Sequence, residues 1–335
     1  MNASAAQVRT QEVFHIAFVK NFTVVLLGIV INCINGALVF CFFSNQVFYH
    51  NPRYILYIHM VINDMIQLSA AISLHVLTYI FPVMNVSICT VLVLIAIFTS
   101  INTPLNLAGM AVERYIAICD PLRHSQICTV RRTYTLIALI WCVGAVPGLS
   151  DLVIVLVTRP LSFFSSNIFC YSYNVFNSPY QKVKTEATHA VYMVCMWLTL
   201  IYTYLRVLFA AKAATTDAAS ARKARNTILL HGAQLLLCML SYVSPMVEIN
   251  LLSFIPQYYA HILFLSFLIT HILPRFLSPL IYGIRDEKFR KYMKTYLLCR
   301  KVTVKVRPAK EPLSQMTSNF VDQSIFVGTA NGILI

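Results

Sequence analysis

Glu113, Arg114 and Tyr115 stand together at the end of a long apolar stretch of the chain. A carboxylate and a guanidinium are costly to place at the border of a membrane unless the two charges are paired. A pair that can open and close at this position is suited to act as a switch. The arrangement predicts a membrane protein whose cytoplasmic face is central to its function.

Two more charged residues, Asp64 and Arg275, lie inside apolar stretches. Either charge alone would cost about 3 kcal/mol in the middle of a membrane helix. Together the two side chains could form a neutral pair. The alternative is that Arg275 faces a water-filled cavity without contacting Asp64.

The sequence has ten cysteines, of which only Cys89 and Cys170 fall on the side expected to face outward. In that oxidising compartment the two are expected to form a disulfide, with two free thiols as the alternative. No Cys/His spacing typical of a metal site is present, so neither a metal nor a cofactor is expected. Asn2 and Asn85 begin glycosylation sequons on the same outer side.

The elements that must position these residues are membrane-spanning helices. The chain has 335 residues, of which 58% are hydrophobic and 11% are charged, and its mean hydropathy is +0.70. A soluble domain carries about 25% charged residues, so the bilayer must be the main solvent of this chain. The alternation of membrane β-strands is absent, which favours an all-α bundle. The apolar stretches predict seven helices, at 22–43, 53–80, 86–118, 134–158, 187–211, 227–255 and 258–284.

Lysine and arginine are concentrated in the loops on one side of these spans and in the C-terminal segment. This bias predicts a cytoplasmic C-terminus and an extracellular N-terminus. The net charge of +14 is then largely a cytoplasmic surface that attracts anionic membrane lipid. The charges are dispersed rather than gathered in one groove, so no nucleic acid partner is expected. The predicted organisation is an extracellular tail at 1–21, a seven-helix domain at 22–284, an amphipathic membrane-surface helix at 285–300 and a disordered cytoplasmic tail at 301–335.

Three motifs then occur in order on the predicted helices. Residues 110–123 read MAVERYIAICDPLR, residues 223–231 read KARNTILLH and residues 279–285 read PLIYGIR. Together they resemble the ends of the third and seventh helices and the start of the sixth helix of rhodopsin-like (class A) G-protein-coupled receptors, and within these the odorant (olfactory) receptors. The resemblance covers about residues 20–298.

Several positions depart from the family pattern. Glu113 replaces the usual Asp, Ser278 replaces the Asn of Asn-Pro-x-x-Tyr, and Thr103 stands where an acid is expected on the third helix. Asp64 matches the family's acid on the second helix, which in related receptors can hold a sodium ion. The hypothesis drawn from this is that Arg275 replaces the ion as the counter-charge.

The resemblance implies a plasma-membrane receptor that binds a small odorant in the outer half of the bundle. Its cytoplasmic face would open to a heterotrimeric G protein of the stimulatory class, which raises cyclic AMP. In the resting state Glu113 would hold Arg114. The residues implied in this switch are Glu113, Arg114, Tyr115, Lys223, Thr227, His231 and Tyr282.

The implied ligand site is a mostly apolar wall with a few hydrogen-bonding groups, as small-molecule sites tend to be. Its predicted residues are Ala96, Ile97, Ser100, Ile101, Tyr242, Met246, Glu248, Leu268 and His271. Three acids near the outer mouth, Asp151, Glu186 and Glu248, favour a cationic or polar ligand. The alternative is that water at the membrane interface solvates them.

The segment that follows the seventh helix is amphipathic. Phe289 and Tyr292 are expected to dip into lipid beside lysines at the headgroups. Cys299 at its end is either a palmitoylation site or a plain thiol.

Other functions fit the sequence less well. A secondary transporter would show inverted repeats in matching halves, which are not found. An intramembrane enzyme would need paired acids or a His-Glu-x-x-His motif, so no catalytic residue is assigned. A non-olfactory class A receptor for a metabolite or pheromone stays open.

Overall fold

The computed structural model describes residues 3–81, 83–176, 178–213, 236, 259–277 and 289–292. Several predicted residues and the predicted sixth helix at 227–255 are therefore outside the described part of the chain, as is the tail at 301–335. The predicted residues concerned are Asn2, Lys223, Thr227, His231, Tyr242, Met246, Glu248, Ser278, Tyr282 and Cys299.

Five long apolar helices dominate the described residues, as the hydropathy predicts. They are α1 (Ala3–Phe43), α2 (Pro52–Ile80), α3 (Val86–Cys119), α5 (Val130–Thr158) and α8 (Pro179–Ala213). Each contains a segment long and apolar enough to cross a membrane. A further helix, α10 (Tyr259–Phe267), continues through the π-helix η3 (Leu268–Ile272), and the helical stretch extends to residue 277. Large apolar side chains such as Phe40, Val157 and Phe209 are exposed, which suits surfaces solvated by lipid tails.

Local sequence signals fix several helix starts. At α2, Pro52 occupies the first turn and Asn51 Oδ1 accepts a hydrogen bond from the backbone N–H of Arg53 at 3.1 Å. The Thr129 side chain accepts in the same way from the N–H of Arg132 at the start of α5. At α3 the Asn85 side chain caps the helix by accepting from the N–H of Ser87. A free N–H at each helix start is thereby satisfied.

Two helices begin earlier than predicted. The first span was predicted to begin at residue 22 after an extracellular tail, but α1 begins at Ala3. Residues 3–21 contain neither proline nor glycine, so no helix breaker separates them from the apolar span. The fifth span was predicted from residue 187, whereas α8 begins at Pro179, a residue favoured in the first turn of a helix.

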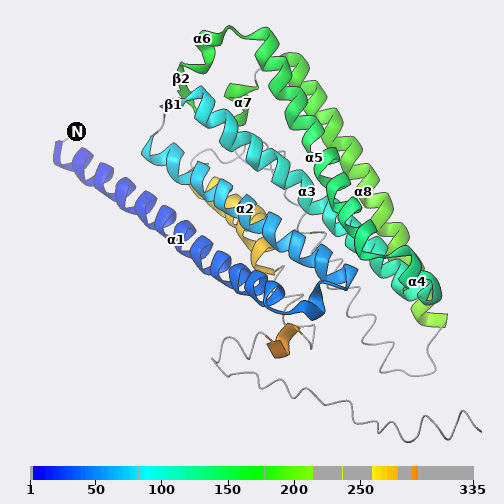
Figure 1. The fold of residues 1–335 in the computed structure, drawn as a ribbon. Helices are drawn as coiled ribbons and strands as arrows, with labels where there is room; N and C mark the ends of the chain where they lie inside the picture. Colours follow the sequence, from blue (N-terminus) through cyan, green and yellow to red (C-terminus); the bar gives the residue numbers. More distant parts are fainter. Residues whose placement is uncertain are drawn as a thin grey trace, which may run out of the picture. The chain divides into compact units, whose positions relative to one another are not determined.

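Helix α3 is the centre of the packing, in contact with α2, α5 and α8 (Figure 1). Two glycines on α5 allow a close approach to α3. A Cβ added at Gly144 would clash with Asn102, and one added at Gly148 would clash with Phe98. Small residues four apart on one helix face are a common means of close packing between membrane helices.

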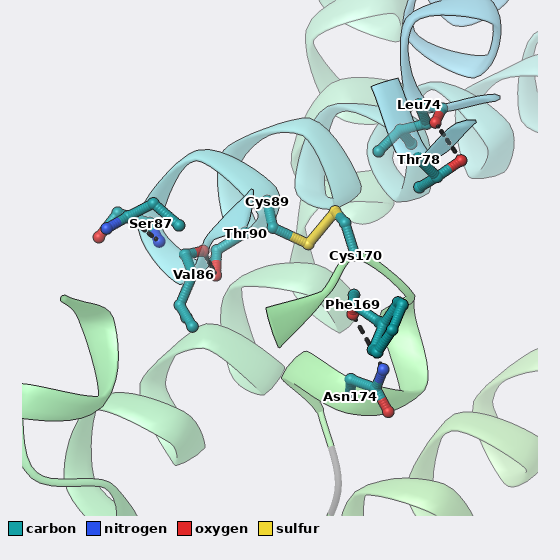
Figure 2. The surroundings of a disulfide bond; sticks show 10 residues. Leu74, Thr78, Val86, Ser87, Cys89, Thr90, Phe169, Cys170 and Asn174 are labelled. Atoms are coloured by element: carbon teal, nitrogen blue, oxygen red, sulfur yellow. Dashed lines mark hydrogen bonds between the residues drawn. A yellow bond between two sulfur atoms is a disulfide. The ribbon is translucent and has the colours of Figure 1, made fainter. Parts of the chain in front are cut away.

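A small structure of two strands and two short helices lies between the start of α3, the end of α5 and the start of α8. It comprises the strands β1 (Val83–Asn85) and β2 (Asn167–Phe169), which pair antiparallel, and the short helices α6 (Leu161–Phe164) and α7 (Ser172–Val175). The predicted disulfide between Cys89 and Cys170 is confirmed, with an S–S distance of 2.04 Å (Figure 2). It joins the first turn of α3 to the residue after β2, so the loop is fixed over the bundle.

At the other end, short elements connect the helices, namely η1 (Gln46–Phe48) and α4 (Pro121–Ile127). Phe289 was expected to dip into lipid, but its side chain is only 1% exposed. Its ring lies 4.7 Å from that of Phe48 and 5.7 Å from that of Tyr57, measured between ring centroids. The aromatic cluster of Phe48, Tyr54, Tyr57 and Phe289 offers this ring a tight apolar contact within the protein.

Candidate ligand cavity and Glu113 cluster

The described residues enclose a cavity of about 770 Å³. Its wall combines residues of α1, α2, α3, α8, α10 and η3 with the loop after β2. This volume is within the range of small-molecule sites, about 300–1,000 Å³. Cys170 is itself part of the wall, so the disulfide holds one side of the cavity in place.

Five of the predicted ligand residues line this cavity: Ala96, Ile97, Ser100, Ile101 and His271. They bring α3 and η3 to the same space, as the family resemblance implied. The predictions for Tyr242, Met246 and Glu248 fall outside the described residues.

Leu268 is not part of the described wall. It packs instead against a cluster formed by Ile31, Leu68 and Ile272. Leu268 opens the π-helix η3, which holds one more residue per turn than an α-helix. The prediction for Leu268 was carried over from the family pattern, and the structure places this side chain in the apolar cluster instead.

Other wall residues were not assigned to the ligand site from the sequence. Lys20 and Asn21 come from α1, Tyr171 from the residue after the disulfide, Ser172 from the start of α7, and His189 from α8. An apolar span does not reveal which face turns inward, so the sequence offered no signal for α1. His75 and Arg275 were noted as ionisable residues in spans, and both also line the cavity.

A hydrogen-bond network forms the α2–α3 side of the cavity. Asn63 Nδ2 donates to Thr103 Oγ1 at 2.9 Å, and Gln67 Nε2 donates to Ser100 Oγ at 2.7 Å. The Thr103 hydroxyl is 3.1 Å from Gln67 Oε1 and 3.3 Å from Asp64 Oδ1, and its single proton can be donated to one of them. Buried polar groups in a membrane helix need such partners.

Asp64 and Arg275 are both buried. The ion pairs found between described residues are those of Glu113 with His124 and of Lys184 with Asp151, so the predicted Asp64–Arg275 pair is not among them. The Arg275 Nη1 donates instead to the backbone oxygen of Thr270. The pairing of the two charges stays a prediction.

A buried ion pair joins the outer parts of α5 and α8. Lys184 Nζ lies 2.6 Å from Asp151 Oδ1 and donates to Ser150 Oγ at 2.7 Å. Gln181 Nε2 adds a bond to the backbone oxygen of Asp151 at 3.0 Å. Asp151 was interpreted as an acid near the mouth that would favour a cationic ligand, but Lys184 already neutralises it.

At the end of the bundle away from the disulfide, the carboxylate of Glu113 has His124 as its partner. His124 Nε2 on α4 lies 3.0 Å from Glu113 Oε1, and Glu113 is only 8% exposed. The predicted latch between Glu113 and Arg114 stays a prediction. The ring of Tyr115 lies 5.9 Å from that of Tyr202 on α8, so the motif also contacts a neighbouring helix.

Cys128, just after α4, lies in the same region. Burial raises the pKa of its thiol, and the nearby Glu113 carboxylate raises this pKa further, while Arg132 lowers it. The thiol is therefore protonated and weakly nucleophilic at neutral pH.

The structure has helices long enough to cross a membrane, a disulfide at one end with a cavity beside it, and a charged cluster at the opposite end. These features define the class as a multi-pass membrane receptor. The family model described as "7 transmembrane receptor (rhodopsin family)" matches residues 34–282, and the chain belongs to this family.

Relatives narrow this assignment to the olfactory branch. The chain is 31% identical to "Odorant receptor 131-2" of Danio rerio over 293 residues, which cover 84% of this chain and 86% of the relative. It is 28% identical to "Olfactory receptor 11A1" of Homo sapiens over 304 residues, covering 86% and 91% of the two chains. It is 24% identical to "Olfactory receptor 4F4" of Homo sapiens over 257 residues, covering 72% and 79%.

Proposed function

We propose that this protein is an odorant receptor of the plasma membrane, in which a small molecule bound in the cavity activates a heterotrimeric G protein. The observation that carries the proposal is the cavity itself, walled by residues from helices along most of the chain and bounded by the disulfide-anchored loop. A ligand that fits one arrangement of these helices better than another shifts the population toward it.

Helix α3 connects the cavity to the cytoplasmic end. Residues from Val93 to Pro104 line the cavity, and Glu113 lies further along the same helix. Pro104 lies inside the helix, where its missing N–H weakens the backbone ladder and permits a bend. A change of α3 at the cavity would thus reach the Glu113–His124 contact.

The proposed orientation places the N-terminus outside and the C-terminus in the cytoplasm. The excess of lysine and arginine in the loops on the inner side supports it. On this orientation Asn2 and Asn85 are candidate glycosylation sites, and residues 285–300 lie near anionic lipid headgroups, where Cys299 could be palmitoylated. The proposed partners are a small-molecule odorant, a G protein of the stimulatory class and membrane lipid.

A cyclic AMP reporter in cells expressing the full-length chain tests this function. Glu113→Gln removes the carboxylate charge that faces His124 and should raise basal cyclic AMP about five-fold, the effect of roughly 1 kcal/mol on a two-state equilibrium. Glu186→Gln is the matched control, because Glu186 is an exposed acid outside the cavity wall. Signals should be normalised to the receptor at the cell surface.

If neutralising Glu113 leaves both basal and ligand-stimulated cyclic AMP unchanged, the proposed switch at Glu113 is wrong. If no ligand raises cyclic AMP although the receptor is at the cell surface, the proposed coupling to a stimulatory G protein is wrong. A receptor for a metabolite or pheromone would give the same reporter response. The tissue in which the protein is expressed separates that alternative from olfaction.

A further inference from the structure

We propose that the cavity recognises an organic anion, with a small carboxylate bound by Arg275 and His271 and its apolar tail held by the aromatic wall. The inference rests on the proposed receptor function and specifies its ligand class. It reverses the expectation of a cationic ligand that the sequence raised.

The ionisable side chains on the described wall of the cavity are all basic. Lys20, His75, His189, His271 and Arg275 line it, whereas no aspartate or glutamate is among the described lining residues. The positive charges of Lys20 and Arg275 in a site of low dielectric attract a negative charge, and the histidines add hydrogen-bonding groups.

An acidic residue on the cavity wall would repel an anionic ligand, so the positions of the described acids matter. Asp151 is neutralised by Lys184 at 2.6 Å, and Glu186 is exposed and not on the wall. Asp64 is buried and is not among the described lining residues, and its Oδ1 lies 3.3 Å from the hydroxyl of Thr103. These acids therefore contribute no carboxylate to the described surface of the cavity.

The position of Arg275 is the strongest argument for an anionic ligand. Its side chain is only 4% exposed, yet it lines the cavity and is hydrogen-bonded to the backbone oxygen of Thr270 through Nη1. A guanidinium has five N–H donors in a planar fork that matches a carboxylate, so most of its donors are left for a ligand. A buried charge without a partner costs several kcal/mol, and a bound carboxylate would offset that cost.

His271 adds a second donor one turn before Arg275. Its Nδ1 atom is buried and has no hydrogen-bond partner in the structure. His271 and Arg275 both line the cavity from neighbouring turns of this helical stretch, so the imidazole and the guanidinium can meet the same anionic group. A buried polar atom without a partner at a cavity wall is the feature expected of a site that a ligand completes.

Aromatic and aliphatic side chains surround these donors. The Phe267 ring lies between two imidazoles, with centroids 4.8 Å from His75 and 5.0 Å from His271. Phe264, one turn earlier, also lines the cavity and lies 5.5 Å from Lys20 Nζ. Such a wall suits the alkyl or aryl tail of a carboxylate better than a strongly hydrated inorganic anion.

Binding can be tested without G-protein coupling. The full-length receptor, purified in detergent, would be heated with octanoate, octanamide or octylamine, which share a chain length and differ in the charge of the head group. A ligand that binds the folded state raises the unfolding temperature. Octanoate should raise it, whereas octanamide should have a much smaller effect and octylamine none.

Substitutions then locate the head group. Arg275→Gln should raise the octanoate concentration needed for half of the temperature shift at least ten-fold. Arg275→Lys should weaken octanoate binding less, because lysine keeps the positive charge but lacks the planar pair of guanidinium donors. His271→Phe should weaken the binding of octanoate while leaving the small effect of octanamide on the unfolding temperature unchanged. Arg159→Gln is the control, since it removes a positive charge from an exposed outer residue that is not on the cavity wall.

Two results would overturn the proposal: stabilisation by octylamine but not octanoate, or an octanoate response that Arg275→Gln and His271→Phe leave intact. Strong coupling of Asp64→Asn with Arg275→Gln in a stability cycle, without any effect of octanoate, would also refute it and favour the internal ion pair. The cyclic AMP response to Glu113→Gln is independent of these measurements. A failure of anion binding is thus distinguishable from a failure of the proposed function.

Discussion

Thr103 shows how one side chain can organise the interior of a membrane bundle. The family pattern leads to an acid at this position, but the hydroxyl of Thr103 both accepts from Asn63 and can donate to Gln67 or Asp64. A carboxylate there would place a second negative charge beside Asp64 in a medium of low dielectric, which would raise the cost of burying both. The substitution leaves Asp64 as the acid of this network.

The contact between His124 and Glu113 can be tested at the residue scale. His124→Ala removes a partner from a buried carboxylate, which costs about 1–3 kcal/mol. If the contact belongs to the resting state, basal cyclic AMP should rise, because the open state loses nothing. His50→Ala is the control, as His50 is an exposed histidine in the loop before α2. Unchanged basal signalling at equal surface expression would rule out this role for His124.

The Lys184–Asp151 pair makes a second prediction. Lys184→Met leaves a buried carboxylate without its counter-charge and should destabilise the receptor by about 3–5 kcal/mol. The double change Asp151→Asn with Lys184→Met should recover much of this loss, measured as the unfolding temperature in detergent. Lys182→Met, two residues earlier on an exposed face, should have little effect. Additive losses in the double variant would show that the pair is not energetically coupled.

At the scale of the elements, α3 and α5 depend on small residues for their close approach. Gly144→Ala would place a Cβ against the Asn102 side chain, and such overpacking costs about 1–3 kcal/mol. Gly109→Ala in the same interface is the control, because its Cβ would make an ordinary contact with Leu136 at 3.4 Å. The unfolding temperature should fall for Gly144→Ala only. Equal effects of the two changes would show that the close approach at Gly144 is unimportant.

The sequence was most informative about the elements and least informative about their faces. Hydropathy located α2, α3 and α5 to within a few residues, because the bilayer demands long apolar runs. It could not show that Lys20 of α1 lines the cavity, since this residue precedes the predicted span at 22–43 and was assigned to an extracellular tail. The π-helix η3, which begins at Leu268, has no signal in hydrophobic spacing.

The candidate site could be predicted only in part for a related reason. Cys89 and Cys170 were paired by compartment, and the α3 wall residues followed from the family resemblance. The neutralisation of Asp151 by Lys184 and the partnership of Glu113 with His124 depend on three-dimensional contacts between different helices. Charges counted along the chain therefore suggested a cationic ligand, whereas their arrangement in space favours an anion.

For the whole molecule, the orientation in the membrane is directly testable. An epitope at the N-terminus should be stained on intact cells, and one at the C-terminus only after permeabilisation, because the positive residues hold the inner loops in the cytoplasm. An epitope placed in the loop between α5 and β2, after Arg159, should behave like the N-terminal one and serves as an internal reference. Staining of both termini on intact cells would contradict an odd number of spans.

The burial of Phe289 sets a limit on how short the protein can be made. Its ring packs against that of Phe48, which is itself fully buried, so the connection between α1 and α2 depends on a residue much later in the chain. A stop codon placed before residue 289 would expose an apolar aromatic surface that is prone to aggregation. We expect quality control in the endoplasmic reticulum to retain such a product. A stop codon after residue 294 spares the ring and should permit export.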